Sequence, residues 1–129
     1  MGTKTIGMNW SQLITKSTTD VFQPVTGWMS AKNIAAARVT WEIASIEGDG
    51  TTTVTPAYQT ANFPDSPDAP AAIDTGDGQT TKDVFYPSTY QDLKTALEDA
   101  QIVRFGFWIK SSSGTGFARA RGSIDLVSR

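Results

Sequence analysis

The chain has 129 residues, with 11 basic and 13 acidic side chains and neither cysteine nor histidine. This length predicts one domain spanning residues 1–129. The missing residue types exclude disulfides, thiolate nucleophiles, histidine general bases and the usual zinc ligand sets. Because no nucleophile–base pair or metal-ligand set is recognisable either, we expect a protein that is not an enzyme and needs no cofactor.

The composition also bears on location and fold. No apolar run approaches the roughly 18 residues that a membrane-spanning helix needs. The start, MGTKTIGMNW, has no apolar h-region, so we expect no signal peptide. Threonine, serine, glycine and aspartate are abundant while glutamate is rare, which favours a β-rich protein with many turns.

The first half of the chain predicts strands. One or two irregular strands precede residue 36, because the apolar runs there are short and broken by Pro24 and Gly27. Residues 37–58 then alternate and predict a hairpin, with its two-residue turn at Gly48-Asp49 or Asp49-Gly50. Trp41 falls on the apolar face of this hairpin and is expected in the core. Pro56 has no N–H to donate, which predicts a sheet edge or a bulge at its strand.

A long acidic loop follows, at about residues 62–83. The segment 47–83 holds seven acidic groups against Lys82 alone, whereas residues 1–46 and 84–129 are both net basic. Such a charge distribution allows the acidic loop of one copy to pair with a basic face of another. Aspartate is also favoured in surface loops for turn formation alone, and the sequence leaves both interpretations open.

The stretch DTGDGQTTKD within this loop resembles a calcium site at first sight. A helix–loop–helix calcium loop needs carboxylates at positions 1, 3, 5 and 12, and neither Asp74 nor Asp77 begins a frame that supplies them. We therefore expect no metal here. A less regular site would have to use Asp74, Asp77 and Asp83 together with backbone carbonyls.

One short helix is predicted at about residues 88–100. Ser88 is the expected N-cap, and Gln91 completes a capping box. Tyr90, Leu93 and Leu97 then recur at helical spacing and indicate an apolar face.

The C-terminal segment 103–127 predicts a second hairpin. Closure about Ser113 and Gly114 places large side chains opposite small ones on one face, which allows that face to pack without voids. The predicted pairs are Ile109 with Ala118, Phe107 with Ala120, Phe105 with Gly122, and Val103 with Ile124. Together with residues 37–58, this hairpin predicts a mainly β fold, an antiparallel two-layer β-sandwich of jelly-roll or Greek-key type.

The opposite face of the C-terminal hairpin is basic and aromatic. Trp108 is expected across from Arg119 as a cation–π pair. Such a face can bind a neighbouring subunit, a sugar or a nucleic acid, or it can be ordinary surface. The candidate partner-binding residues of this face and of the acidic loop are Asp65, Asp68, Asp74, Asp77, Arg104, Trp108, Lys110, Phe117, Arg119 and Arg121.

Two segments carry a resemblance, PAYQTANFPDSPDAP and VRFGFWIKSSSGTGFARARGSIDL. Together they look like the small β-sandwich virion structural proteins of tailed bacteriophages, which serve as capsid decorations, spikes or tail parts. The resemblance covers roughly the second half of the chain. It implies a non-enzymatic protein that assembles in many copies with itself and with other virion proteins, in the host cytoplasm, and is located in the virion.

The alternative is a carbohydrate-binding module or host-glycan adhesin, which requires a row of exposed aromatic rings. The candidate rings are Trp108, Phe117, Tyr86, Trp10 and Trp28. Nucleic-acid binding is not expected, because the isoelectric point is acidic and the arginines are scattered.

Overall fold

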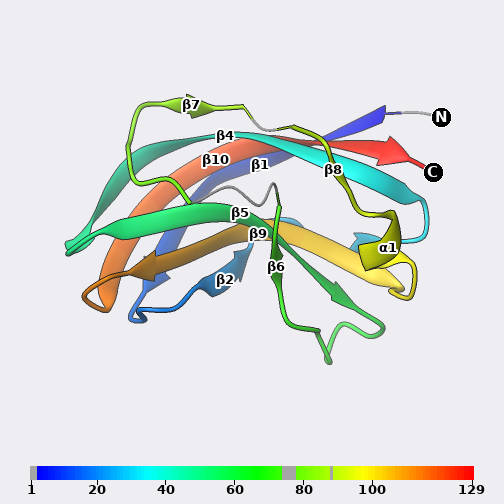
Figure 1. The fold of residues 1–129 in the computed structure, drawn as a ribbon, viewed down its shortest axis with the longest axis horizontal. Helices are drawn as coiled ribbons and strands as arrows, with labels where there is room; N and C mark the ends of the chain where they lie inside the picture. Colours follow the sequence, from blue (N-terminus) through cyan, green and yellow to red (C-terminus); the bar gives the residue numbers. More distant parts are fainter. Residues whose placement is uncertain (1–2, 74–77, 88) are drawn as a thin grey trace.

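The protein is described by a computed structural model that covers residues 3–73, 78–87 and 89–129. Two antiparallel sheets, here sheet A and sheet B, pack face to face as a sandwich (Figure 1). The predicted fold class is therefore confirmed. Among the described residues, no helix is long and apolar enough to cross a membrane.

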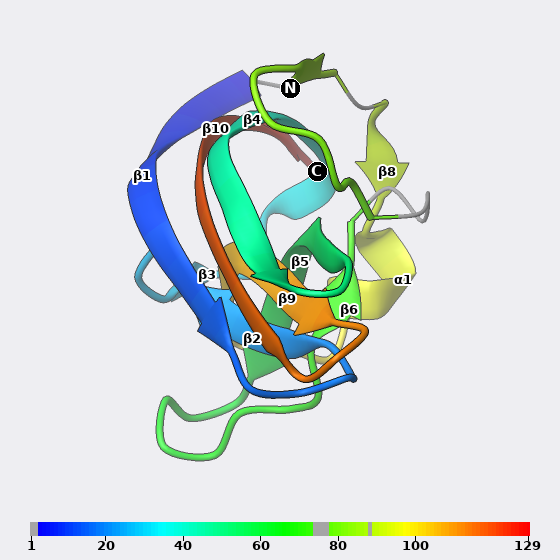
Figure 2. The ribbon, with the colours of Figure 1, turned by 90° about the vertical axis from the view of Figure 1, so that its left-hand side faces the viewer.

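Each sheet combines long strands of 10 to 16 residues with short strands of 2 to 4 residues. Sheet A has the order β1-β10-β4-β7, with β8 also beside β4; its strands are β1 Thr3–Thr15, β10 Thr115–Ser128, β4 Ile34–Asp49, β7 Phe85–Tyr86 and β8 Gln91–Asp92. Sheet B has the order β2-β9-β5-β6, with β3 also beside β9; its strands are β2 Val21–Pro24, β9 Ile102–Ser111, β5 Thr52–Ala61, β6 Ala71–Ala72 and β3 Met29–Ser30. Both sheets curve around one shared core (Figure 2).

The core fills the space between the two sheets. Alternate residues of β9 point inward and are fully buried, as are the small side chains Ala118 and Ala120 of β10. Trp41 is 4% exposed, and its ring centroid lies 5.6 Å from that of Phe107 on the opposing sheet. The predicted core position of Trp41 is confirmed.

Both predicted hairpins are wrong in their pairing, although their strands exist. β9 belongs to sheet B and pairs with β5 and β2, whereas β10 belongs to sheet A and pairs with β1 and β4. In the same way β4 and β5 lie in different sheets. The large and small side chains that were expected side by side in one sheet instead lie on the facing surfaces of two sheets. Each turn therefore forms an arch between the layers.

The two arches lie side by side and are bonded to each other. Ser112 N donates to Thr51 O over 3.0 Å, and Thr51 N donates to Ser112 Oγ over 2.8 Å. Ser111 Oγ also donates to Asp49 O. Gly50 and Gly114, one in each turn, have φ values of 85° and 84°, a region that glycine adopts at little cost. These contacts close one end of the sandwich.

The predicted helix is shorter than expected. Gln91 and Asp92 form β8 and pair with β4, so that helix α1 covers Lys94–Leu97 only. Asp92 Oδ1 accepts a hydrogen bond from Lys94 N at 2.9 Å, close to the start of the helix. The predicted N-cap, Ser88, lies outside the described residues. Leu97 is buried as expected, whereas Tyr90 is exposed.

The described parts of the acidic loop follow the edge of sheet B. β6 pairs with Ala57 and Tyr58, and Ile73 N donates to Pro56 O at 2.9 Å. Farther along, Gln79 forms an isolated bridge with Val54. A further isolated bridge joins Ala61 to Pro67. Since only short segments of the described residues cover this side of β5, Pro56 stands next to the sheet edge, where its missing N–H is tolerated.

Candidate functional site

The outer face of sheet A carries an exposed tryptophan because β1 contains an irregularity. Its register with β10 shifts between Met8 and Ser11, so Asn9 and Trp10 together stand opposite Arg121. A bulge of this kind reverses which side chains face outward. Trp10 is therefore 36% exposed, although the alternation of Ile6 and Met8 would have turned it inward.

A row of four side chains crosses this face from one strand to the next. Arg121 of β10 pairs in register with Glu42 of β4, which in turn pairs with Phe85 of β7. Arg121 Nε donates to Glu42 Oε1 at 2.6 Å, and its guanidinium lies 4.4 Å from the centroid of the Trp10 ring. The order across the row is therefore an aromatic ring (Trp10), a cation (Arg121), an anion (Glu42) and a second aromatic ring (Phe85).

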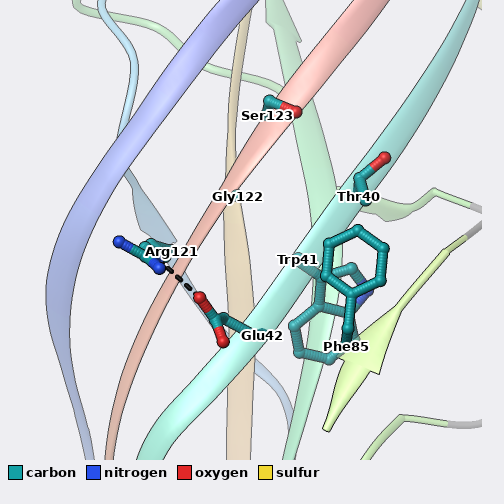
Figure 3. A pocket seen from close by; sticks show the side chains of 7 residues that line it. All are labelled: Thr40, Trp41, Glu42, Phe85, Arg121, Gly122 and Ser123. Carbon is teal, nitrogen blue, oxygen red and sulfur yellow. Dashed lines mark hydrogen bonds and ion pairs between the residues drawn. The ribbon is translucent and has the colours of Figure 1, made fainter. Parts of the chain in front are cut away.

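A surface depression of about 310 Å³ lies over the part of this row formed by Arg121, Glu42 and Phe85 (Figure 3). Phe85 stands on its β7 side and is 63% exposed, while the Arg121–Glu42 pair stands toward β10. Its lining residues are Thr40, Trp41, Glu42, Phe85, Arg121, Gly122 and Ser123. An apolar ring, two hydroxyls and an ion pair make a site that can receive an apolar group carrying a polar neighbour.

A second cation on the same face has a different environment. The guanidinium of Arg119 lies 5.2 Å from the Trp10 ring. Among the described residues, no carboxylate lies within ion-pair distance of it. Arg119 therefore contributes a positive charge that no carboxylate in the described part of the chain neutralises.

An ion pair also joins β4 to β10. Arg38 Nη2 donates to Asp125 Oδ2 at 2.7 Å, and Thr5 Oγ1 donates to Asp125 Oδ1 at 2.7 Å. The hydrogen bond from Arg38, followed by that from Thr5, holds the pKa of Asp125 below its ordinary value. Arg38 also covers the ring of Tyr90, 4.6 Å from its centroid.

This depressed pKa predicts a pH dependence of stability. The Asp125 carboxylate contributes stability that is fully present above its unfolded-state pKa of about 3.9 and is lost as pH falls through the lower folded-state pKa. Asp125→Asn is therefore expected to reduce stability at neutral pH and to flatten its decline below about pH 4. Urea midpoints measured from pH 7 to pH 2 test this, with Asp99→Asn as an exposed control. An unchanged acid slope in Asp125→Asn would contradict it.

The predicted basic face is divided between the two sheets. Arg104, Trp108 and Lys110 lie on the outside of sheet B, whereas Arg119 and Arg121 lie on the outside of sheet A. The expected Trp108–Arg119 pair is therefore wrong, because the two strands do not pair. In the structure the guanidinium of Arg104 lies 4.3 Å from the centroid of the Trp28 ring, and the guanidinium of Arg119 lies over the Trp10 ring. Phe117 is half-buried on the sheet A side.

The predicted acidic residues separate into four groups. Asp65 is exposed, and among the described residues its carboxylate has no hydrogen-bond or ion-pair partner. Asp68 is also exposed but accepts a hydrogen bond from Thr60 Oγ1 at 2.8 Å. Asp83 is exposed and has a φ of 61°. Asp74 and Asp77 lie outside the described residues, and within the described part no group of three acidic residues is placed to hold a metal ion.

The rings proposed for a sugar platform do not share one surface. Trp10 lies outside sheet A and Trp28 outside sheet B, and Tyr86 packs against Trp41 at 4.9 Å. Glu42 and Phe85 were missed as site residues. The alternation around Trp41 does place Glu42 outward, but nothing in the sequence signals that Phe85 pairs beside it.

Comparisons with known proteins identify the fold. No protein-family model and no curated protein matches the sequence. VP2 of infectious bursal disease virus, in a subviral particle, matches 97% of this chain with a TM-score of 0.61 and 12% identity. Structures of the Gx and Gt strains of that virus match 98% and 97% of it, with TM-scores of 0.59 and 0.57 and identities of 8% and 10%. The chain spans 32% of the length of each matched chain, and at these identities the likeness shows a shared β-sandwich fold.

Proposed function

We propose that this protein is a non-enzymatic structural component of a virion that assembles in many copies through protein–protein contacts. The observation that carries the proposal is the fold shared, over 97% of the chain, with VP2 of an infectious bursal disease virus subviral particle. The sequence resemblance adds a tailed bacteriophage as the source and the host cytoplasm as the place of assembly. Since the matched structures come from infectious bursal disease virus, they support the virion role and not the type of virus.

The surface of the molecule supports an assembling role. Several large apolar side chains remain exposed, where contact with a neighbouring copy would remove them from water. They are Trp10, Ile14, Val21, Phe63, Val84, Phe85 and Tyr90. Aromatic residues and arginine, which are enriched at protein interfaces, gather on the outer face of sheet A.

Self-association in solution tests the proposed function. Light scattering behind size exclusion is expected to show oligomers that grow with protein concentration. These should become smaller at high salt, because salt screens exposed charge pairs. Negative-stain microscopy of the largest species is expected to show ordered rings or filaments. A monomer at every concentration and salt level would contradict assembly by this chain alone.

A further inference from the structure

A projecting turn carries an exposed aromatic ring. Ser66 N donates to Phe63 O at 3.1 Å, which closes a four-residue turn with Pro64 at its second position. The segment containing this turn extends beyond sheet B, on the side away from sheet A (Figures 1 and 2). Phe63 is 69% exposed, the largest fraction among the exposed large apolar side chains of the described residues.

Hydrogen bonds fix this turn to the sheet. Asp68 N donates to Thr60 O at 2.9 Å, and Thr60 Oγ1 donates back to the Asp68 carboxylate. Gln59 Nε2, on a buried side chain, donates to Asp68 O at 2.8 Å. The turn is therefore held in place before any partner arrives, and a preorganised contact loses less conformational entropy on binding.

The receiving surface is the depression on the outer face of sheet A. Its volume of about 310 Å³ and its exposed Phe85 ring suit an aromatic side chain. Arg121 borders it, and Arg119 lies two residues along the same face of β10 with no acidic partner among the described residues. A hollow that contains an exposed aromatic ring, beside a cation with no acidic partner among the described residues, is complementary to a phenyl ring beside a carboxylate that is likewise unpaired among them.

The turn and the receiving face both place their two groups two residues apart. Residues two apart on a strand are separated by about 6.7 Å, which is the spacing along β10 between Arg119 and Arg121, the residue at the β10 border of the depression. Phe63 and Asp65 are also two residues apart, within a turn whose first and last Cα atoms lie less than about 7 Å apart. One turn can therefore present its ring to the depression and its carboxylate to Arg119 together.

We propose that the Phe63–Ser66 turn of one copy docks on the outer face of sheet A of another copy. Phe63 enters the depression at its Arg121 border, and Asp65 pairs with Arg119. This deepens the proposed function and rests on it. Because the turn points away from its own sheet A, the contact joins two different surfaces on two molecules. Such a contact propagates beyond a dimer, into closed rings or open filaments.

Charge reversal tests the contact. Asp65→Lys and Arg119→Glu are each expected to weaken self-association about tenfold or more, because each places like charges together. An equimolar mixture of the two variants is expected to restore association, since every contact in an alternating chain then joins opposite charges. The double variant should be restored on its own for the same reason. Phe63→Ala is expected to weaken association about thirtyfold through loss of a central aromatic anchor.

Asp20→Lys is the matched control, because Asp20 is exposed between β1 and β2 and should leave association unchanged. Thermal unfolding of each variant verifies that the fold is retained. A wild-type protein that stays monomeric would overturn the proposed assembly by this chain alone and this contact together. Wild-type assembly that is insensitive to both charge reversals, is not restored by mixing, or stops at a dimer would overturn the contact alone.

Discussion

Gly106→Ala is expected to lower the free energy of unfolding by about 3 kcal/mol or more, the upper range for an added methyl in a packed site. A Cβ at this position would overlap the carbonyl oxygen of Gln23 and lie 2.8 Å from Pro24 Cα. Both are backbone atoms of β2, so no side chain can rotate away. The chain after β2 is also fixed, since Val25 N and Thr26 N both donate to Phe105 O.

Chemical denaturation of Gly106→Ala measures this loss, and Gly7→Ala is the matched control. A Cβ at Gly7 has no neighbouring atom within 4 Å and should change stability by less than about 0.5 kcal/mol. Equal stability of the two variants would show that β2 does not approach β9 as closely as described.

Phe107→Ala is expected to lower the free energy of unfolding by about 3–5 kcal/mol, the usual range for removing a buried phenyl ring. Phe107 is fully buried, and its ring meets Trp41 across the sandwich. The substitution therefore removes the contact of this ring with Trp41 and leaves a cavity between the sheets.

The same denaturation experiment distinguishes the core from the surface. Phe63→Ala removes an identical ring from an exposed position and should cost less than about 0.5 kcal/mol. Phe107→Leu keeps much of the apolar volume and is expected to fall between the two. A small loss in Phe107→Ala would contradict the packing of the two sheets described here.

The sequence predicted which side chains face inward much better than which strands are neighbours. Alternation reports only the face of a strand, and Val103, Phe105 and Ala118 are buried as it indicated. Alternation carries no information on the hydrogen-bonding partner. A short polar turn such as SSSGTG suits a hairpin within one sheet and an arch between two sheets equally well. The arches depend on contacts such as that of Thr51 with Ser112, which are far apart in sequence.

The site could be predicted only in part for the same reason. Arg119 and Arg121 were recognised from the outward positions of their strand. Trp10 reaches the same face only through a bulge, which reverses the alternation that would predict its direction. Phe85 joins the row through two residues of pairing between β7 and β4, at the end of a long loop, where local sequence does not specify register.

The pairing of β1 has a consequence for how the chain folds. In the described structure β1 pairs with β10 alone, and Thr3 stands opposite Val127. Bringing β1 and β10 together closes a loop of almost the whole chain, which is entropically costly. Proteins dominated by pairings between residues far apart in sequence fold in milliseconds to seconds. During synthesis β1 stays unpaired until β10 has been synthesised, after almost all of the domain. The bulge at Asn9 and Trp10 makes the unpaired edge of β1 irregular, which disfavours pairing with strand edges of other incompletely folded chains.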